Sequence, residues 1–223
     1  MFEGIMNFFV IAVENMPKFR GAIGNTLLLS ILSIIFGVVI GIIVNLMTMT
    51  KIKPLVWIAK FYIAVIRGTP LLLQLFFVFY GLPQIGIYFS SFASAVLGLA
   101  FHNGAYISEI FRGAILAVPH GQNEASRAIG MTKLQAFRHV IFPQAFKHAV
   151  PALGNQFLVS VLDSSLASVI TITETMMKAR QLAAATYSIF PIYFDAALFY
   201  LLMTYVLSFF LKKLENRLKV NER

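Results

Sequence analysis

The 223-residue chain contains no cysteine and very little charge. Without cysteine, disulfide bonds, thiolate metal sites and cysteine nucleophiles are excluded. Charged residues make up only 12% of the chain and hydrophobic residues 59%, whereas soluble domains contain roughly 25% charged residues. A chain of this length has no core large enough to bury so much apolar surface, so lipid must cover part of it. The composition therefore predicts an integral membrane protein.

Acidic residues are also scarce, with 9 Asp and Glu against 18 Lys and Arg and a net charge of +9. Such an excess can indicate nucleic-acid binding, but these basic residues lie between hydrophobic segments and form no long basic run. We therefore expect no nucleic-acid partner. The first residues lack the basic region of a cleavable signal peptide, so we expect the first membrane span itself to direct insertion.

Five segments are apolar enough to cross a bilayer, which takes about 20 mostly apolar residues. One uncharged stretch, 68–101, is too long for a single helix and is broken near Pro83, where closely spaced Gly and Pro favour a turn. Asp163 interrupts the fourth segment, and residues 1–20 are expected to lie at the membrane interface. We predict helices over residues 24–49, about 68–82, 90–111, 151–171 and 193–211.

The basic residues predict the orientation of the chain in the membrane. If the C-terminus is cytoplasmic, 14 of the 18 Lys and Arg residues face the cytoplasm. The opposite topology would place the same residues outside. We therefore predict an external N-terminus, a cytoplasmic C-terminus and a single transmembrane domain over residues 1–223, with a cytoplasmic polar region over 113–148.

The polar region between the third and fourth predicted helices has a helix–turn–helix pattern over residues 122–139. We expect a turn at Gly130, because glycine accommodates a positive φ, and a second helix capped by Thr132. Pro143 and Pro151 are expected to bound the entry to the fourth span. A structured hairpin outside the membrane favours a docking surface, and an ordinary amphipathic linker is the alternative.

The hairpin also resembles the EAA signature of bacterial ATP-binding-cassette (ABC) importer permeases, which reads Glu-Ala-Ala, three residues, Gly, nine residues, then Ile-x-Leu-Pro. The spacing is intact, and Ser126, Val140 and Phe142 are conservative departures. Further segments are similar to the polar amino-acid branch of that family, so that the resemblance covers roughly residues 21–217. The matching segments are Glu124-Ala125-Ser126, Gly130, Val140-Ile141-Phe142-Pro143, Asn25-Thr26-Leu27, Arg67-Gly68-Thr69-Pro70-Leu71-Leu72, Tyr106-Ile107-Ser108-Glu109-Ile110-Phe111-Arg112-Gly113 and Asp163-Ser164-Ser165-Leu166.

The resemblance implies an all-α membrane protein with the type I importer permease fold, located in the bacterial cytoplasmic (inner) membrane. It implies a second permease subunit (identical or different), partner ATPases that bind ATP and Mg²⁺, and an extracytoplasmic amino-acid-binding protein. It further implies that the hairpin is a coupling helix seated on the ATPase. The chain has no Gly-x4-Gly-Lys-Ser/Thr phosphate loop, so we expect it to bind no cofactor or metal and to leave ATP hydrolysis to its partner. The expected coupling residues are Glu124, Ala125, Ser126, Gly130 and Pro143.

Polar residues within the spans are candidates for a substrate pathway, because ionisable groups in a bilayer are costly unless paired or hydrated. His102, Tyr106 and Glu109 fall on one helical face at i, i+4 and i+7, and Asn103 lies beside them. Two alternatives remain for this face. Glu109 would pair with Arg112 at i+3, and His102 would be a hydrogen-bonded core residue.

Asp163 stands out because it lies within a predicted span and has no basic neighbour in sequence. We expect Asp163, Ser164 and Ser165 to line the pathway, with capping or packing as the alternative for the serines. Similar permeases carry Lys immediately before this Asp, whereas this chain has Leu162. A carboxylate without that cation favours a positively charged ligand. The hypothesis is import of arginine, lysine or histidine by alternating access, with glutamine and cystine as alternatives.

Two other classes of function remain open from the sequence. A small channel would need only the spans and would not require the spacing from Glu124 to Pro143. An intramembrane enzyme would need a nucleophile and a base in contact. Ser164 and His102 are present, but nothing in the sequence brings them together, so no catalytic residue is assigned.

Overall fold

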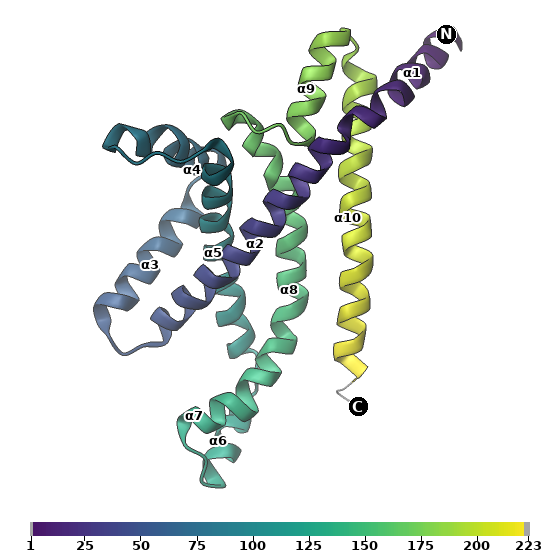
Figure 1. Ribbon diagram of the computed structural model, residues 1–223. Coiled ribbons are helices and arrows are strands. Elements are labelled where there is room, and N and C mark those ends of the chain that lie inside the picture. Colours follow the sequence, from purple (N-terminus) through teal and green to yellow (C-terminus); the bar gives the residue numbers. More distant parts are fainter. Residues whose placement is uncertain (1, 221–223) are drawn as a thin grey trace.

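The structure, a computed structural model, describes residues 2–220, and the regular elements of this range are all helices. Figure 1 shows the long helices packed side by side, with the N-terminus and the C-terminus at opposite ends of the molecule. The hairpin around Gly130 lies at the same end as the C-terminus. The predicted all-helical fold is therefore confirmed. An arrangement with the termini at opposite ends agrees with an odd number of crossings.

The chain begins with a long apolar helical segment. Residues Phe8–Met49 form a stretch of 42 residues that is long and apolar enough to cross a membrane. The helix predicted over 24–49 is confirmed as part of it, while the interfacial placement of residues 1–20 stays a prediction. The elements are α1 (Phe2–Asn15), η1 (Met16–Phe19) and α2 (Arg20–Met49).

The next segment is a bent pair of helices rather than the single helix predicted over 68–82. α3 begins already at Lys53, and the chain bends by 110° before α4. The bend lies at Thr69-Pro70, because the residue before proline is held in an extended conformation. The predicted start is wrong because Lys60 and Arg67 interrupt the apolar run of α3. The elements are α3 (Lys53–Gly68), α4 (Leu71–Phe76), the π-helical η2 (Phe77–Gly81) and η3 (Leu82–Ile85).

The bend also affects the predicted orientation, which assumed that Lys51, Lys53 and Arg67 lie on the same side of the membrane. Lys51 and Lys53 lie at the start of α3, whereas Arg67 lies in its last turn. Figure 1 shows that these two ends of α3 lie at different heights along the bundle, with the second nearer α4. Arg67 therefore does not share a loop with the two lysines. The predicted orientation relative to the membrane stays a prediction.

The second half of the chain contains two further long helices and the hairpin. Pro151 lies inside α8, so the prediction that it bounds this helix is wrong. The other helices of a membrane bundle can compensate for the one backbone hydrogen bond that a proline removes. α8 ends at Asp163, the residue that was predicted to interrupt this span. The helix α9 was not predicted. The elements are α5 (Ser91–Leu116), α6 (His120–Ala128), α7 (Lys133–Ala136), the π-helical η4 (Phe137–Ile141), α8 (Phe142–Asp163), η5 (Ser164–Ile170), α9 (Thr175–Thr186) and α10 (Ile189–Val220).

Length and hydropathy identify three spans in the described residues, or four if the bent pair counts as one. These are Phe8–Met49, Lys133–Ile170, Ile189–Leu218 and the α3–α4 pair. α5 has 26 residues but is not among them. Its polar residues, among them His102, Asn103 and Glu109, lower its hydropathy. The predicted total of five spans therefore stays a prediction.

α5 lies at the centre of the bundle, packed closely against α2. A Cβ atom placed on Gly41 of α2 would lie 2.7 Å from the Ile107 side chain and 3.1 Å from the Ser108 backbone nitrogen. Both distances are shorter than an ordinary van der Waals contact. Glycine at this position therefore allows the two backbones to approach, as small residues do between membrane helices.

We expect the Gly41→Ala variant to lose about 1–3 kcal/mol of stability, because the added methyl group would force α2 away from α5. The matched control is Gly24→Ala on the same helix, where an added Cβ meets no atom within 4 Å. Thermal unfolding in detergent should show a lower midpoint for Gly41→Ala than for the unmodified chain, and an unchanged midpoint for Gly24→Ala. Equal midpoints for the two variants would contradict the assigned contact.

Candidate functional site

The predicted hairpin is confirmed, and local backbone interactions define its turn. Gly130 has φ +88°, as predicted. Its N–H donates to the Arg127 carbonyl and the Met131 N–H donates to the Ser126 carbonyl, both at 3.1 Å, which is the Schellman arrangement that ends a helix. Thr132 and Gln135 then form a reciprocal capping box at the start of α7. The turn is therefore specified by its own sequence.

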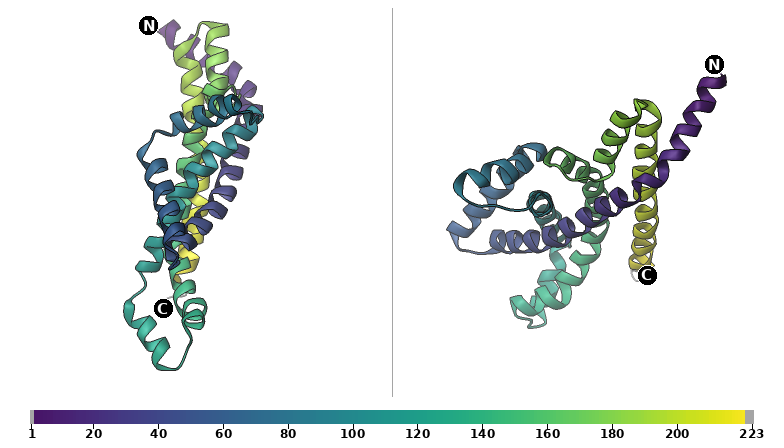
Figure 2. Two further views of the ribbon diagram at one scale, coloured as in Figure 1. Left: turned by 90° about the vertical axis from the view of Figure 1, so that its left-hand side faces the viewer. Right: turned by 45° about the horizontal axis from the view of Figure 1, so that its top comes forward.

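The hairpin presents charged and apolar side chains to the outside. Figure 2 shows it extending beyond the C-terminal end of α10. Ile129 and Leu134, close to the turn, are 75% and 74% exposed. The Glu124 side chain is 70% exposed and lies 3.1 Å from His120. The role of these exposed side chains as a docking surface stays a prediction.

The other predicted coupling residues lie in different environments. Ala125, Gly130 and Pro143 are exposed. Ser126 is buried, and its hydroxyl donates to the Asn123 carbonyl at 2.8 Å. Ser126 therefore faces the inside of the hairpin, where it stabilises α6.

The predicted polar face of α5 exists, and it is held by residues of α3 and α4. His102 Nδ1 lies 3.1 Å from Gln74 Oε1, and the His102 and Tyr106 ring centroids are 4.9 Å apart. The Arg67 guanidinium lies 5.4 Å from the Tyr106 ring centroid, within the range of a cation–π interaction. Gln74 also donates to the Ile66 carbonyl at 2.8 Å, which ties the α3–α4 bend to α5.

Glu109 lies at the end of this face nearest the C-terminus of α5, and it has two basic partners. Arg112 Nη2 is 2.8 Å and Arg67 Nη1 is 3.4 Å from Glu109 Oε2. The predicted alternative, an ion pair between Glu109 and Arg112, is therefore confirmed, and the sequence did not indicate the second partner, Arg67. The carboxylate of Glu109 is neutralised within this chain. A role of this face in a substrate pathway stays a prediction.

Asn103 is separated from this face, although it is next to His102 in sequence. It is 1% exposed, donates to Ser160 Oγ at 3.0 Å and accepts from Gln156 Nε2 at 2.9 Å. Ser160 Oγ is also 3.1 Å from Ser33 Oγ. These contacts join α2, α5 and α8 through a buried polar network. Asn103 thus contacts the helix junction and not the face that carries His102.

Asp163 is half-buried at the last position of α8. It makes no ion pair with the described residues. The hydroxyl of Ser164 donates to the Val161 carbonyl at 2.7 Å, whereas Ser165 remains half-buried. Ser164 therefore caps the end of α8, which was the predicted alternative for the serines. Ser164 bonds to Val161 and His102 bonds to Gln74. No hydrogen bond joins Ser164 to His102 in the described chain.

A second buried polar cluster, which the sequence did not indicate, holds α9 against the bundle. Glu174 is fully buried, caps α9 through the N–H groups of Met176 and Met177, and accepts from the Tyr200 hydroxyl at 2.6 Å. Thr26 of α2 bonds to Thr175 at 2.8 Å. The carboxylate of Glu174 accepts three hydrogen bonds, so its role is structural. In the sequence, only the position of Glu174 before a helix could have indicated this capping role.

Comparison with known proteins identifies the class to which this arrangement belongs. The family described as "Binding-protein-dependent transport system inner membrane component" matches residues 37–220. The chain therefore belongs to this family of inner-membrane proteins. The predicted family and location are confirmed.

Similar proteins of this family narrow the class. The chain is 42% identical to the L-cystine transport system permease protein TcyB of Bacillus subtilis, over 91% of this chain and 87% of that one. It is 36% identical to the arginine transport system permease protein ArtQ of the same organism, over 96% and 98%. A crystal structure of an amino acid ABC transporter with histidines matches with a TM-score of 0.88 and 42% identity, covering 92% of this chain and 96% of that chain. The chain is the permease subunit of an amino-acid ABC importer.

We expect Asn103→Ala to lower stability by about 1–3 kcal/mol, because Gln156 and Ser160 would lose a buried hydrogen-bond partner. The control is Tyr106→Phe on the same helix, which removes no hydrogen bond found among the described residues. Thermal unfolding of the purified variants in detergent measures the difference. A midpoint for Asn103→Ala equal to that of the control would show that the network does not hold the helices together.

Proposed function

We propose that this permease imports a polar amino acid with a cationic side chain (arginine, lysine or histidine). Asp163 carries the proposal, because it is a half-buried carboxylate with no ion-pair partner in the described chain. An uncompensated carboxylate of this kind would attract a positively charged group.

The same site would also attract the α-ammonium group that all amino acids share. Glutamine and cystine therefore remain the alternative substrates. The relatives named above transport cystine and arginine, so similarity alone does not decide between these classes. Leu162, in the position before Asp163, favours the cationic side chain because it leaves the carboxylate without an adjacent lysine.

The proposed mechanism is alternating access driven by a partner ATPase. In this mechanism, closure of two ATPases moves the hairpins of two permease subunits together, and the attached helices α5 and α8 rock to expose the pathway. The exposed Glu124 and the apolar residues Ile129 and Leu134 support a role of the hairpin as the ATPase contact. The substrate would arrive from an extracytoplasmic binding protein, and ATP and Mg²⁺ would be bound by the ATPase.

Asp163→Asn should reduce arginine uptake far more than glutamine uptake. Loss of a charge-assisted hydrogen bond of about 1.5–3 kcal/mol corresponds to a roughly ten- to hundredfold decrease in affinity. The measurement is uptake of each amino acid into proteoliposomes that contain the permease, its ATPase and a binding protein. Asp163→Glu, which keeps the charge, is the control. An equal loss of both substrates would exclude discrimination by this carboxylate.

Glu124→Ala and Gly130→Pro should each reduce ATPase binding and substrate-stimulated ATP hydrolysis. Proline fixes φ near −65°, which is incompatible with the positive φ of Gly130. Gly121→Ala in the same hairpin is the control, because an added Cβ meets no atom within 4 Å there. Co-purification with a co-expressed ATPase and its activity in detergent are measured. Unchanged co-purification of both variants would show that the partner docks elsewhere.

A further inference from the structure

One exposed face of α10 changes from apolar to basic along its length. With 100° per residue, this face follows the positions i, i+3, i+4 and i+7 of the helix. Its upper part is an open apolar surface. Its lower part is a similarly open surface that carries the basic residues. In order, the residues are Leu198, Leu201, Leu202 and Tyr205 above, and Phe209, Lys212, Lys213, Asn216 and Arg217 below.

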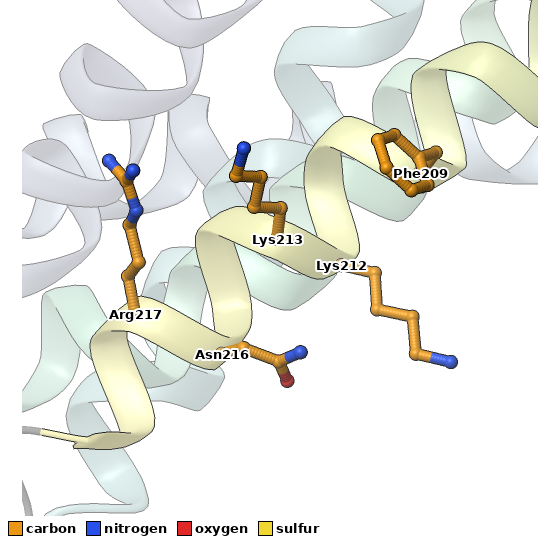
Figure 3. Close-up of a pocket in the computed structure, with 5 residues that line it drawn as sticks. All are labelled: Phe209, Lys212, Lys213, Asn216 and Arg217. Atoms are coloured by element: carbon orange, nitrogen blue, oxygen red, sulfur yellow. The ribbon is translucent and has the colours of Figure 1, made fainter.

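The basic part of this face carries its polar side chains in two rows. Figure 3 shows Lys213 and Arg217 pointing to one side of α10, with Lys212 and Asn216 on the other and Phe209 about one turn above. All four polar side chains are exposed. None of the three cations makes an ion pair with the described residues.

The acidic residue nearest to this cluster in sequence is Glu215, three residues after Lys212 on the same helix. It makes no ion pair with the cluster in the described residues. The three positive charges therefore remain available to an external anion, and an amide donor lies between them.

The apolar part has the dimensions of one lipid leaflet. The twelve residues from Leu198 to Phe209 extend roughly 16 Å along the helix axis. Half of a typical hydrocarbon core is about 15 Å thick. Leu201, Leu202 and Tyr205 are 65%, 58% and 70% exposed, so an acyl chain has direct access to this surface.

We propose that this face of α10 is a binding site for an anionic phospholipid of the leaflet on the hairpin side. Lys213 and Arg217 bind the phosphate from one side of the helix, Lys212 and Asn216 contact the headgroup from the other, and one acyl chain lies along Leu198, Leu201, Leu202 and Tyr205. Charge complementarity selects an anionic headgroup, because a zwitterionic lipid adds its own cation to a cluster that already has three. The exposed apolar surface next to the charges favours a lipid over a soluble phosphate.

The test compares lipid retention by the purified chain in native mass spectrometry, using phosphatidylglycerol and phosphatidylcholine. The combined variant Lys212→Gln, Lys213→Gln and Arg217→Gln should lower the preference for phosphatidylglycerol by on the order of tenfold or more. The matched control replaces Lys51, Lys53 and Lys60 by Gln, which removes the same charge from another exposed surface. Gel filtration and thermal midpoints verify folding, and Arg217→Gln alone is used if the combined variant does not fold.

Two further arms distinguish the source of the anion. Glycerol 3-phosphate, which has the headgroup charge but no acyl chain, should not displace phosphatidylglycerol. A short-chain phosphatidylglycerol should bind more weakly than a long-chain one. Three results would each overturn the proposal. The control variant could lose the preference for phosphatidylglycerol equally, or glycerol 3-phosphate could displace the lipid. The third is a dimer in which a second copy of the chain covers this face and no lipid is retained.

Discussion

The close contact of α2, α5 and α8 is the constraint on which the rest of the structure depends. Glycine at position 41 lets α2 approach the α5 backbone, and Asn103 bonds to α8 through Ser160 and Gln156. Lipid gives no hydrophobic drive for helices to associate, so close packing and internal hydrogen bonds must supply it. Because these contacts are buried and satisfied, they fix the relative positions of three helices without using the exposed polar residues.

This junction determines where the functional elements lie. α5 and α8 leave it at one end and are joined there by the hairpin, so a force applied to the hairpin acts directly on both helices (Figure 1). One turn beyond Ser160, at the end of α8, lies Asp163. The same two helices therefore connect the proposed ATPase contact to the proposed substrate site. In the proposed mechanism, this connection couples the two events.

The sequence predicted the local features of this fold better than the contacts between its parts. Gly130 and Thr132 were predictable because the turn and the cap depend only on neighbouring residues. The start of α3 was not, because Lys60 and Arg67 interrupt the apolar run from which a span is predicted. The face of His102 followed from helical periodicity, but periodicity cannot show that Arg67, from another helix, joins it. The exclusion of Asn103 from this face depends likewise on Ser160, which is distant in sequence.

Glu109, Asp163, Glu174 and Asp195 are four acidic residues of the bundle that differ in accessibility and in pairing. Glu109 is paired with two arginines, and Glu174 is saturated by two backbone N–H groups and Tyr200. Asp195 has no hydrogen-bond partner among the described residues, but it is fully buried, so a substrate does not reach it in this conformation. Asp163 differs from all three, because it is partly exposed and makes no ion pair. A mobile cation binds where the negative charge is both accessible and uncompensated. Of these four carboxylates, Asp163 alone meets both conditions.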